Sequence, residues 1–231
     1  MSICVIPARG GSKRIPRKNI REFLGKPMIA WPILASIDCG FFERIVVSTD
    51  DDEIAEVAER FGAEVPFRRS ADLADDYTPT VPVIADAIAR LGVPPRTPVC
   101  CLYATSPFVA PADLSRGLIR LEETDAPFVL SVTTFPFPIQ RALRRSRSGN
   151  VEMLHPEQMQ TRSQDLEEAW HDAGQFYWGR AKSWATRPWV FDSGTQGVAV
   201  PRHRVQDIDT EEDWQRAERM MRGLHQEGVG I

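Results

Sequence analysis

Short apolar runs recur along the chain and constrain its fold more than any other feature. They are continuous rather than alternating, which is typical of strands buried on both faces of a sheet. The runs are ICVI (3–6), IVV (45–47), VCCL (99–102) and FVLSV (128–132). Two further strands are expected at 174–178 (GQFYW) and 197–200 (GVAV).

Helical patterns separate these runs. Residues 52–61 carry acidic residues in the first turn, Arg60 near the end and Gly62 just beyond it, as a helix prefers. Similar patterns lie at 81–91, at 112–122, near 180–185 and from about 210 to 222. Alternating strands and helices predict an α/β fold in which a mostly parallel, doubly wound sheet has helices on both faces.

The alternation breaks between about 133 and 174. Prolines at 136 and 138 and a turn signal at Ser148-Gly149-Asn150 favour a hairpin-like excursion over another strand–helix–strand unit. We therefore expect one domain over residues 1–231, with residues 135–172 forming an arm within it. Arms of this kind often mediate dimerisation.

Charge and hydropathy exclude several classes of function. The chain of 231 residues has 28 Lys and Arg against 32 Asp and Glu, so a net charge of −4 provides no overall attraction to nucleic acid or to an anionic membrane. No segment approaches the roughly 18 apolar residues that span a bilayer. We expect a soluble, cytoplasmic protein whose four cysteines, none in a C-x-x-C pair, are reduced and buried.

Positive charge is concentrated at the start of the chain, in ICVIPARGGSKRIPRKN (3–19). In a doubly wound sheet, ligands bind beyond the carboxyl ends of the strands, and this loop follows the first strand. Gly10 and Gly11 allow close approach to a ligand and Ser12 adds a donor, so a triphosphate is the expected ligand. The cations are Arg9, Lys13, Arg14, Arg17 and Lys18. The G-x-x-x-x-G-K-[ST] motif is absent, and a solvated basic loop is the alternative.

The loop IPARGGSKRIPRKN resembles the signature of the nonulosonic acid cytidylyltransferases, the CMP-sialic acid synthetase family. The resemblance continues through LGKPMIAWPI (24–33), 46–76, ATSPF (104–108), TRSQDLEEAWHDAGQFYWG (161–179) and DIDTEEDW (207–214). HDAGQFYWG and CLYATSPF look most like the pseudaminic acid branch. Legionaminic and N-acetylneuraminic acid enzymes are the alternatives, as is a non-catalytic module that binds nucleotide or sugar.

This resemblance implies a Rossmann-like, three-layer α/β/α nucleotidyltransferase fold with a protruding dimerisation arm, and a homodimer. The reaction it implies is attack of the sugar's anomeric 2-hydroxyl on the α-phosphate of CTP, which yields a CMP-sugar and pyrophosphate. It places Lys18 and Arg9 as catalytic cations that neutralise developing charge. The implied nucleotide-binding residues are Ala8, Arg9, Gly10, Ser12, Lys18, Asn19, Arg69 and Asp76. Lys13, Arg14 and Arg17 are expected to be solvent-facing or structural.

The sugar site departs from the sialic acid pattern. Where those enzymes typically read LQPTSP and NGA, this chain reads LYATSP and has Ala173, Gly174 and Gln175, which argues against N-acetylneuraminic acid and for pseudaminic acid, a sugar with two acylamino groups. The expected substrate-binding residues are Tyr103, Thr105, Ser106, Arg162, Gln164 and Gln175. His171 is a further candidate, although a lone histidine is more often structural.

Two acidic stretches follow predicted strands or precede predicted helices. Asp207 and Asp209 alternate along an extended segment and so face the same way, with Ile208 directed into the core. Two carboxylates suit Mg²⁺, and the resemblance favours that metal; the alternative is that Asp209 or Thr210 caps the last helix. Asp50 is expected to cap the helix at 52–61, and to lie near the nucleotide.

Overall fold

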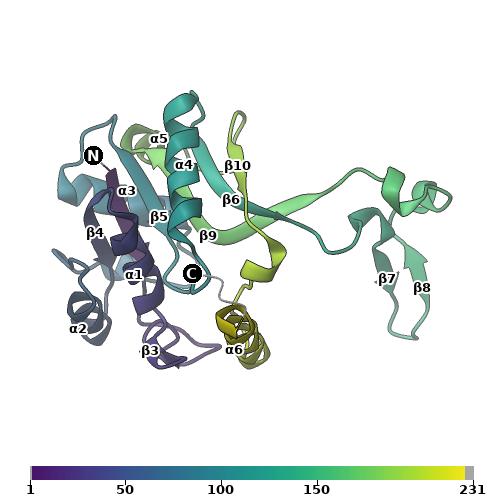
Figure 1. Ribbon diagram of the computed structural model, residues 1–231, viewed down its shortest axis with the longest axis horizontal. Coiled ribbons are helices and arrows are strands. Elements are labelled where there is room, and N and C mark those ends of the chain that lie inside the picture. Colours follow the sequence, from purple (N-terminus) through teal and green to yellow (C-terminus); the bar gives the residue numbers. More distant parts are fainter. Residues whose placement is uncertain (1, 227–231) are drawn as a thin grey trace.

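The computed structural model describes residues 2–226 and contains a six-stranded sheet (Figure 1). The strand order is β10-β6-β9-β5-β1-β4. The strands are β1 (Ser2–Pro7), β4 (Phe42–Ser48), β5 (Pro98–Leu102), β6 (Phe128–Thr134), β9 (Trp170–Arg180) and β10 (Gln196–Ala199). All six predicted strands are therefore present. Residue 1 and residues 227–231 of the predicted domain lie outside the described residues.

Helices cover both faces of this sheet, which confirms the three-layer prediction. One face packs against α1 (Ala30–Cys39), α2 (Asp52–Arg60) and α4 (Pro111–Glu123), and the other packs against α3 (Thr80–Leu91) and α5 (Ala181–Thr186). The alternation of side chains along β1 explains both layers, because Cys4 and Ile6 join the first apolar cluster while Ile3 and Val5 join the second.

The sheet is mostly parallel, with one antiparallel strand. β9 pairs antiparallel with both β5 and β6, whereas β1 pairs parallel with β4 and β5, and β10 pairs parallel with β6. From β1 the chain passes to β4 on one side and then to β5 on the other side. The carboxyl ends of β1 and β5 therefore lie at a switch point of the sheet, where ligands bind in such folds.

Two features were not predicted. Helix α1 contains Pro32 in its first turn and is apolar nearly all round, so it lacks the amphipathic pattern of a surface helix. A third apolar cluster lies beside the main sheet, where Phe23 and Met28 contact Trp214 and Met221 of α6 (Glu211–Gln226). This cluster also holds the small sheet of β2 (Glu22–Phe23) and β3 (Lys26–Pro27), and it attaches α6 to the segment that follows the opening loop.

The predicted excursion is an arm that projects from the body of the molecule between β6 and β9 (Figure 1). It carries a hairpin of β7 (Leu143–Arg145) and β8 (Val151–Met153), whose turn includes Gly149 with a left-handed φ of 93°. The turn signal at 148–150 thus marks a real hairpin. The arm is shorter than predicted, because residues 170–172 belong to β9 and pair with β6.

The cysteines match their expectation only in part. All four cysteines are free thiols, but Cys39 is half-buried, whereas the other three are buried. Its Sγ–H donates to the carbonyl of Ala35 at 3.1 Å, and burial raises the pKa of this thiol to about 12.

Within residues 2–226, no helix combines the length and apolar character needed to cross a membrane.

Candidate active site

Two adjoining cavities lie beyond the carboxyl ends of β1 and β5. The smaller, of about 220 Å³, is formed mainly by the opening loop, and the larger, of about 720 Å³, lies between β9 and the segment that precedes α6. Lys18, Tyr103 and Thr105 line both cavities. A ligand that occupies the two together therefore passes these three side chains.

The opening loop approaches the end of β4. The N–H of Ala8 donates to the carbonyl of Ser48 at 2.9 Å, and the N–H of Gly10 donates to Oδ1 of Asp50 at 2.9 Å. A Cβ on Gly10 would stand 2.7 Å from Oδ2 of Asp51, so only glycine fits here without displacing that carboxylate. The N–H of Gly10 is thus engaged by the protein, while Gly11 faces open space.

The prediction that Asp50 caps α2 is wrong. The capping residue is Asp51, whose Oδ1 accepts from the N–H of Ile54 at 2.9 Å. Asp51 also pairs with Arg17, which holds the pKa of this carboxyl below its ordinary value, with the Ile54 N–H adding to the effect. Asp50 is one residue too early for the cap because the helix begins at Asp52, and it orients the opening loop instead.

The remaining cations of the loop are paired with acidic side chains. Arg9 lies 2.9 Å from Asp76, which Lys13 also contacts. The pKa of the Asp76 carboxyl is lowered, and the hydrogen bond from Lys13 is the largest cause. Arg14 lies 2.8 Å from Asp209. Arg17, which we expected to be solvent-facing or structural, contacts Glu53 as well as Asp51 and has a left-handed φ of 57°.

Lys18 lies where the two cavities meet. Its Nζ donates to the carbonyl of Ile208 at 2.7 Å and lies 3.5 Å from Oδ1 of Asp209. The side chain is about 20% exposed, so its charge is partly removed from water. Asn19, the next residue, is buried in the smaller cavity's wall and donates to the carbonyl of Arg9 at 2.9 Å. These contacts hold the ammonium group between the loop and the segment at 207–209.

The segment at 207–209 has the predicted alternation. Ile208 is 1% exposed and belongs to the third apolar cluster, and Asp207 lines the larger cavity. Asp207 is exposed by area, yet it lies in a concave wall that displaces much of its water. This desolvation, followed by the charge of Asp209, raises the pKa of the Asp207 carboxyl. A carboxylate whose pKa is raised by burial and by a neighbouring carboxylate makes a site where a cation is favoured.

Thr210, rather than Asp209, caps the last helix. The N–H of Asp213 donates to Oγ1 of Thr210 at 3.2 Å, and the N–H of Thr210 donates back to Oδ2 of Asp213 at 2.9 Å. This reciprocal pair is a capping box. Asp209 is therefore available to Lys18 and Arg14, and the capping alternative applies to Thr210 alone.

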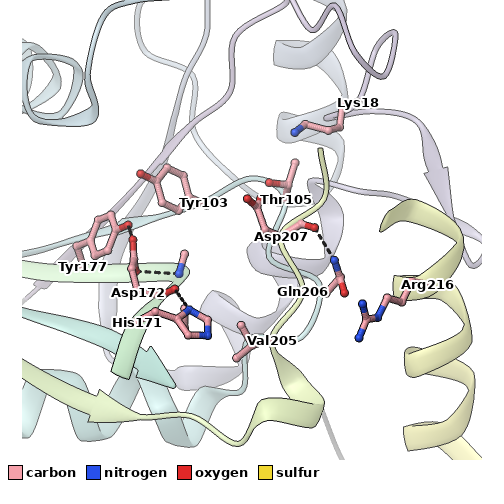
Figure 2. A pocket seen from close by; sticks show the side chains of 12 residues that line it. Lys18, Tyr103, Thr105, His171, Asp172, Tyr177, Val205, Gln206, Asp207 and Arg216 are labelled. Carbon is pink, nitrogen blue, oxygen red and sulfur yellow. Dashed lines mark hydrogen bonds between the residues drawn. The ribbon is translucent and has the colours of Figure 1, made fainter. Parts of the chain in front are cut away.

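The larger cavity has a tyrosine-rich wall (Figure 2). Tyr103 hydrogen-bonds Thr80 at 2.8 Å, and its ring meets that of Tyr177 edge to face at 5.4 Å between centroids. Tyr177 donates to Asp172. Burial raises the pKa of Tyr103 to about 12 and that of Tyr177 further, so both hydroxyls keep their protons at neutral pH.

Several predicted site residues line neither cavity. Ser106 is buried at 4% exposure, and Gln175 at 3%, with its side-chain amide directed to the carbonyl of Arg204. Arg69 is buried and donates to Ser48 Oγ at 3.1 Å and to the Ser48 carbonyl, and burial lowers the pKa of its guanidinium. Arg162 and Gln164 are exposed on the arm. The roles predicted for these five side chains stay predictions.

A buried ion pair supports the wall formed by Arg204 to Asp207. Arg204 lies 2.6 Å from Asp113 of α4, and both side chains are nearly buried, at 11% and 3% exposure. Arg116 also contacts Asp113 and donates to the carbonyl of Ala199 at 2.8 Å. Because Gln175 donates to the carbonyl of Arg204, this ion pair ties the segment before α6 to both α4 and β9.

Five side chains of the larger cavity were not singled out from the sequence. They are Asp172, Tyr177, Val205, Gln206 and Arg216. Asp172 and Tyr177 lie in the motif HDAGQFYWG, so that motif contained the signal. No sequence motif marks Gln206 or Arg216, because these residues reach the cavity only when α6 packs beside the segment that follows the opening loop.

The chain is similar to known cytidylyltransferases over nearly its whole length. The model of a family described as "Cytidylyltransferase" matches residues 3–193. A pseudaminic acid cytidylyltransferase of Campylobacter jejuni is 41% identical, over 97% of this chain and 98% of that protein. A CMP-N,N'-diacetyllegionaminic acid synthase of Legionella pneumophila is 33% identical, over 98% of both chains.

Solved structures share the fold at low identity. A CMP:2-keto-3-deoxy-manno-octonic acid synthetase, solved with CTP, superimposes with a TM-score of 0.71 at 15% identity, covering 96% of this chain and 98% of that one. A 4-diphosphocytidyl-2C-methyl-D-erythritol synthase from Anaerococcus prevotii gives a TM-score of 0.61 at 14% identity. At such identities the likeness establishes an α/β nucleotidyltransferase fold.

Proposed function

The chain belongs to the cytidylyltransferase family, and from this premise we propose that it activates pseudaminic acid with CTP, forming CMP-pseudaminic acid and pyrophosphate. The observation that carries the proposal is the pair of adjoining cavities with Lys18 at their junction. One cavity has the cationic loop that a triphosphate needs, and the other has the hydrogen-bonding wall that a polyhydroxylated sugar needs. The 41% identity over 97% of the chain supports the choice of sugar.

In the proposed reaction, the phosphates of CTP occupy the smaller cavity and the sugar the larger one. The anomeric oxygen of the sugar forms a bond to the α-phosphorus and loses its proton, while the bond between the α-phosphorus and the bridging oxygen breaks and pyrophosphate leaves. Phosphoryl transfer depends chiefly on positioning and on neutralising charge. We propose that Lys18 does both; the support is that it lines both cavities and that its ammonium group is held by Ile208 and Asp209.

The paired cations of the loop suit exchange with phosphate. Lys13, which contacts Asp76, has a side chain that is 78% exposed. Arg14, which contacts Asp209, has a side chain that is 69% exposed. Exposed ion pairs contribute little stability, so a triphosphate can replace the carboxylates at small cost. Arg9, at 34% exposure, is proposed to bind phosphate together with Ser12.

We propose Mg²⁺ as the metal, held by Asp207 and Asp209. Mg²⁺ usually takes one or two carboxylates and completes its octahedron with water and phosphate oxygens. The donor set fits, since Asp207 and Asp209 are two carboxylates that flank the buried Ile208, and burial, followed by the charge of Asp209, raises the pKa of Asp207. When bound, the ion would withdraw charge from the phosphates.

We also propose a homodimer that forms through the arm. The arm presents many exposed apolar side chains for its size: Phe135, Phe137, Ile139, Leu143, Val151, Leu154 and Met159. Exposed apolar area of this kind marks an interaction surface. Arg162 and Gln164 lie on the arm and line neither of the two cavities described above, so contact with the sugar would come from the partner's arm. The proposed location is the cytoplasm, where CTP is available.

A panel of nonulosonic acids tests the proposal. Purified protein is incubated with CTP, Mg²⁺ and pseudaminic, legionaminic or N-acetylneuraminic acid, and both pyrophosphate and CMP-sugar are measured. Pseudaminic acid should give the highest kcat/KM, because buried polar groups that lose their partners reject an analogue strongly. Equal kcat/KM for the three sugars would remove the assignment to pseudaminic acid, and no product from any of them would remove the activity.

A further inference from the structure

Arg14 of the opening loop holds a carboxylate that the proposed reaction assigns to Mg²⁺. Its Nη1 donates to Oδ2 of Asp209 at 2.9 Å, and its Nη2 lies 2.8 Å from Oδ1 of the same carboxylate. Within residues 2–226, Asp209 is the one carboxylate that pairs with Arg14. Both oxygens of Asp209 are therefore occupied by a guanidinium group from a distant segment of the chain.

Arg14 is held less firmly than Lys18, the second cation at Asp209. The side chain of Lys18 is 20% exposed, and its ammonium group also donates to the carbonyl of Ile208 at 2.7 Å. The side chain of Arg14 is 69% exposed. Its backbone is anchored, because the next residue, Ile15, is 2% exposed and belongs to the third apolar cluster. Arg14 can therefore leave Asp209 by a change of side-chain conformation alone.

The charges around Asp209 balance when no metal is bound. Asp207 and Asp209 are opposed by Lys18 and Arg14. Burial, followed by the charge of Asp209, raises the pKa of Asp207, and Lys18 and Arg14 act in the opposite direction, so both cations lie close enough to influence this second carboxylate. A Mg²⁺ ion on Asp209 would add positive charge directly beside the guanidinium group. Because like charges at such a distance disfavour each other, the metal and Arg14 compete for Asp209.

The smaller cavity offers the displaced guanidinium group a new partner. Arg14 lines this cavity together with Arg9, Ser12 and Lys13, where the phosphates of CTP are proposed to lie. A guanidinium group presents a planar fork of donors that fits two phosphate oxygens at once. A metal that takes Asp209 from Arg14 thus makes this fork available to the triphosphate.

Resting on the proposed function, we propose that Arg14 is a further nucleotide-binding residue that exchanges partners. It pairs with Asp209 while the metal is absent, and it binds the phosphates of CTP once a divalent cation occupies Asp209. The exchange makes the binding of the cation and the binding of the triphosphate favour each other, and this coupling is reciprocal. Protein without nucleotide therefore holds the cation weakly, and CTP strengthens its retention.

The test measures the two binding events separately in wild type and in Arg14→Met. Mn²⁺ replaces Mg²⁺ because free Mn²⁺ is detected directly by electron paramagnetic resonance. Without nucleotide, Arg14→Met should bind Mn²⁺ about 3- to 10-fold more tightly than wild type, because the competing guanidinium group is gone. Its CTP affinity, measured by calorimetry, should fall about 10- to 30-fold with saturating Mn²⁺. In EDTA it should fall about 3-fold or less, because wild-type Arg14 is then shared with Asp209. Mn²⁺ bound to free CTP is the same for every variant and cancels in the comparison.

Three further variants serve as controls. Lys13→Met removes a charge from the same loop, but Lys13 pairs with Asp76 instead. It should leave Mn²⁺ affinity unchanged and weaken CTP binding equally with and without Mn²⁺. Arg14→Lys keeps the charge without the fork and should lie between wild type and Arg14→Met in both measurements. Arg96→Met, in the exposed loop between α3 and β5, should change neither affinity, and melting temperatures report on folding.

Unchanged or weaker Mn²⁺ binding by Arg14→Met would overturn the exchange, because Arg14 would then be no obstacle to the metal. Equal losses of CTP affinity with and without Mn²⁺ would also overturn it, since Arg14 would be a permanent phosphate ligand. Wild-type CTP affinity under both conditions would reduce the pair with Asp209 to a structural contact. These measurements need no sugar, so they are independent of the outcome that overturns the proposed function, which is the absence of CMP-sugar from wild-type protein with every nonulosonic acid.

Discussion

Replacement of Lys18 by methionine, which keeps most of the length of the side chain and removes its charge, should lower kcat by about 10²- to 10³-fold. Lys18 lines both cavities and holds its ammonium group 2.7 Å from the carbonyl of Ile208 and 3.5 Å from Asp209. A charge fixed in this way, and partly removed from water, interacts most strongly with the negative charge that develops in the transition state. The KM for CTP should change much less than kcat.

The magnitude has two parts that separate experimentally. Loss of one preorganised donor at the reacting group costs about 2.7–4 kcal/mol of transition-state stabilisation, which corresponds to the change in kcat. Loss of the charged hydrogen bond to the carbonyl of Ile208 costs about 1.5–3 kcal/mol of folding stability. For a chain of this size that is a decrease in melting temperature of about 3–12 °C. The first part appears in turnover and the second in unfolding.

The assay measures pyrophosphate release at saturating CTP and sugar, the KM for each substrate, CTP binding by calorimetry and the melting temperature. Lys182→Met removes a lysine charge from the exposed face of α5 and serves as the matched control, with unchanged kcat expected. Lys18→Arg keeps the charge and should retain part of kcat. A Lys18→Met protein whose KM for CTP rises while kcat stays at the wild-type value would refute the argument.

Four further outcomes follow from the described contacts. Asp207→Asn and Asp209→Asn should each reduce turnover severely with the fold retained, and EDTA should abolish activity that Mg²⁺ restores; wild-type turnover in both variants would leave these carboxylates structural. Leu143→Asp on the arm should convert the proposed dimer to monomer in sedimentation, and a purely monomeric wild type would contradict that proposal. Asp51→Asn keeps an acceptable cap but loses the ion pair with Arg17. Because the pKa of Asp51 is lowered in the folded state, the wild type should be more stable than this variant above the unfolded pKa of about 3.8, and the difference should disappear as pH falls through the folded pKa. A difference in unfolding free energy that does not depend on pH would contradict this. Asp113→Ala leaves its buried arginine partner uncompensated and should cost about 3–5 kcal/mol in chemical denaturation, and a loss below about 1 kcal/mol would show that water reaches the pair.

Local patterns predicted most of the elements of this fold. The six buried strands and five of the helices lie within a few residues of their expected positions, because burial on two faces and helix-end preferences are properties of short stretches. Helix α1 was missed because it is apolar nearly all round. The direction of β9 was not predictable either, since a buried strand reads the same whether its neighbours run parallel or antiparallel.

The sequence by itself determined the chemistry of the site: a cationic glycine loop after the first strand, two acidic residues flanking Ile208, and motifs that resemble one enzyme family. Tertiary structure alone decided which of these groups meet. Lys18 and Asp209 are brought within 3.5 Å because α6 packs on the apolar cluster around Phe23, and Asp172 enters the cavity because β9 runs antiparallel to β5. The physical reason is that residue type and spacing determine local backbone preference and charge, whereas contacts between distant segments depend on how apolar surfaces pack together.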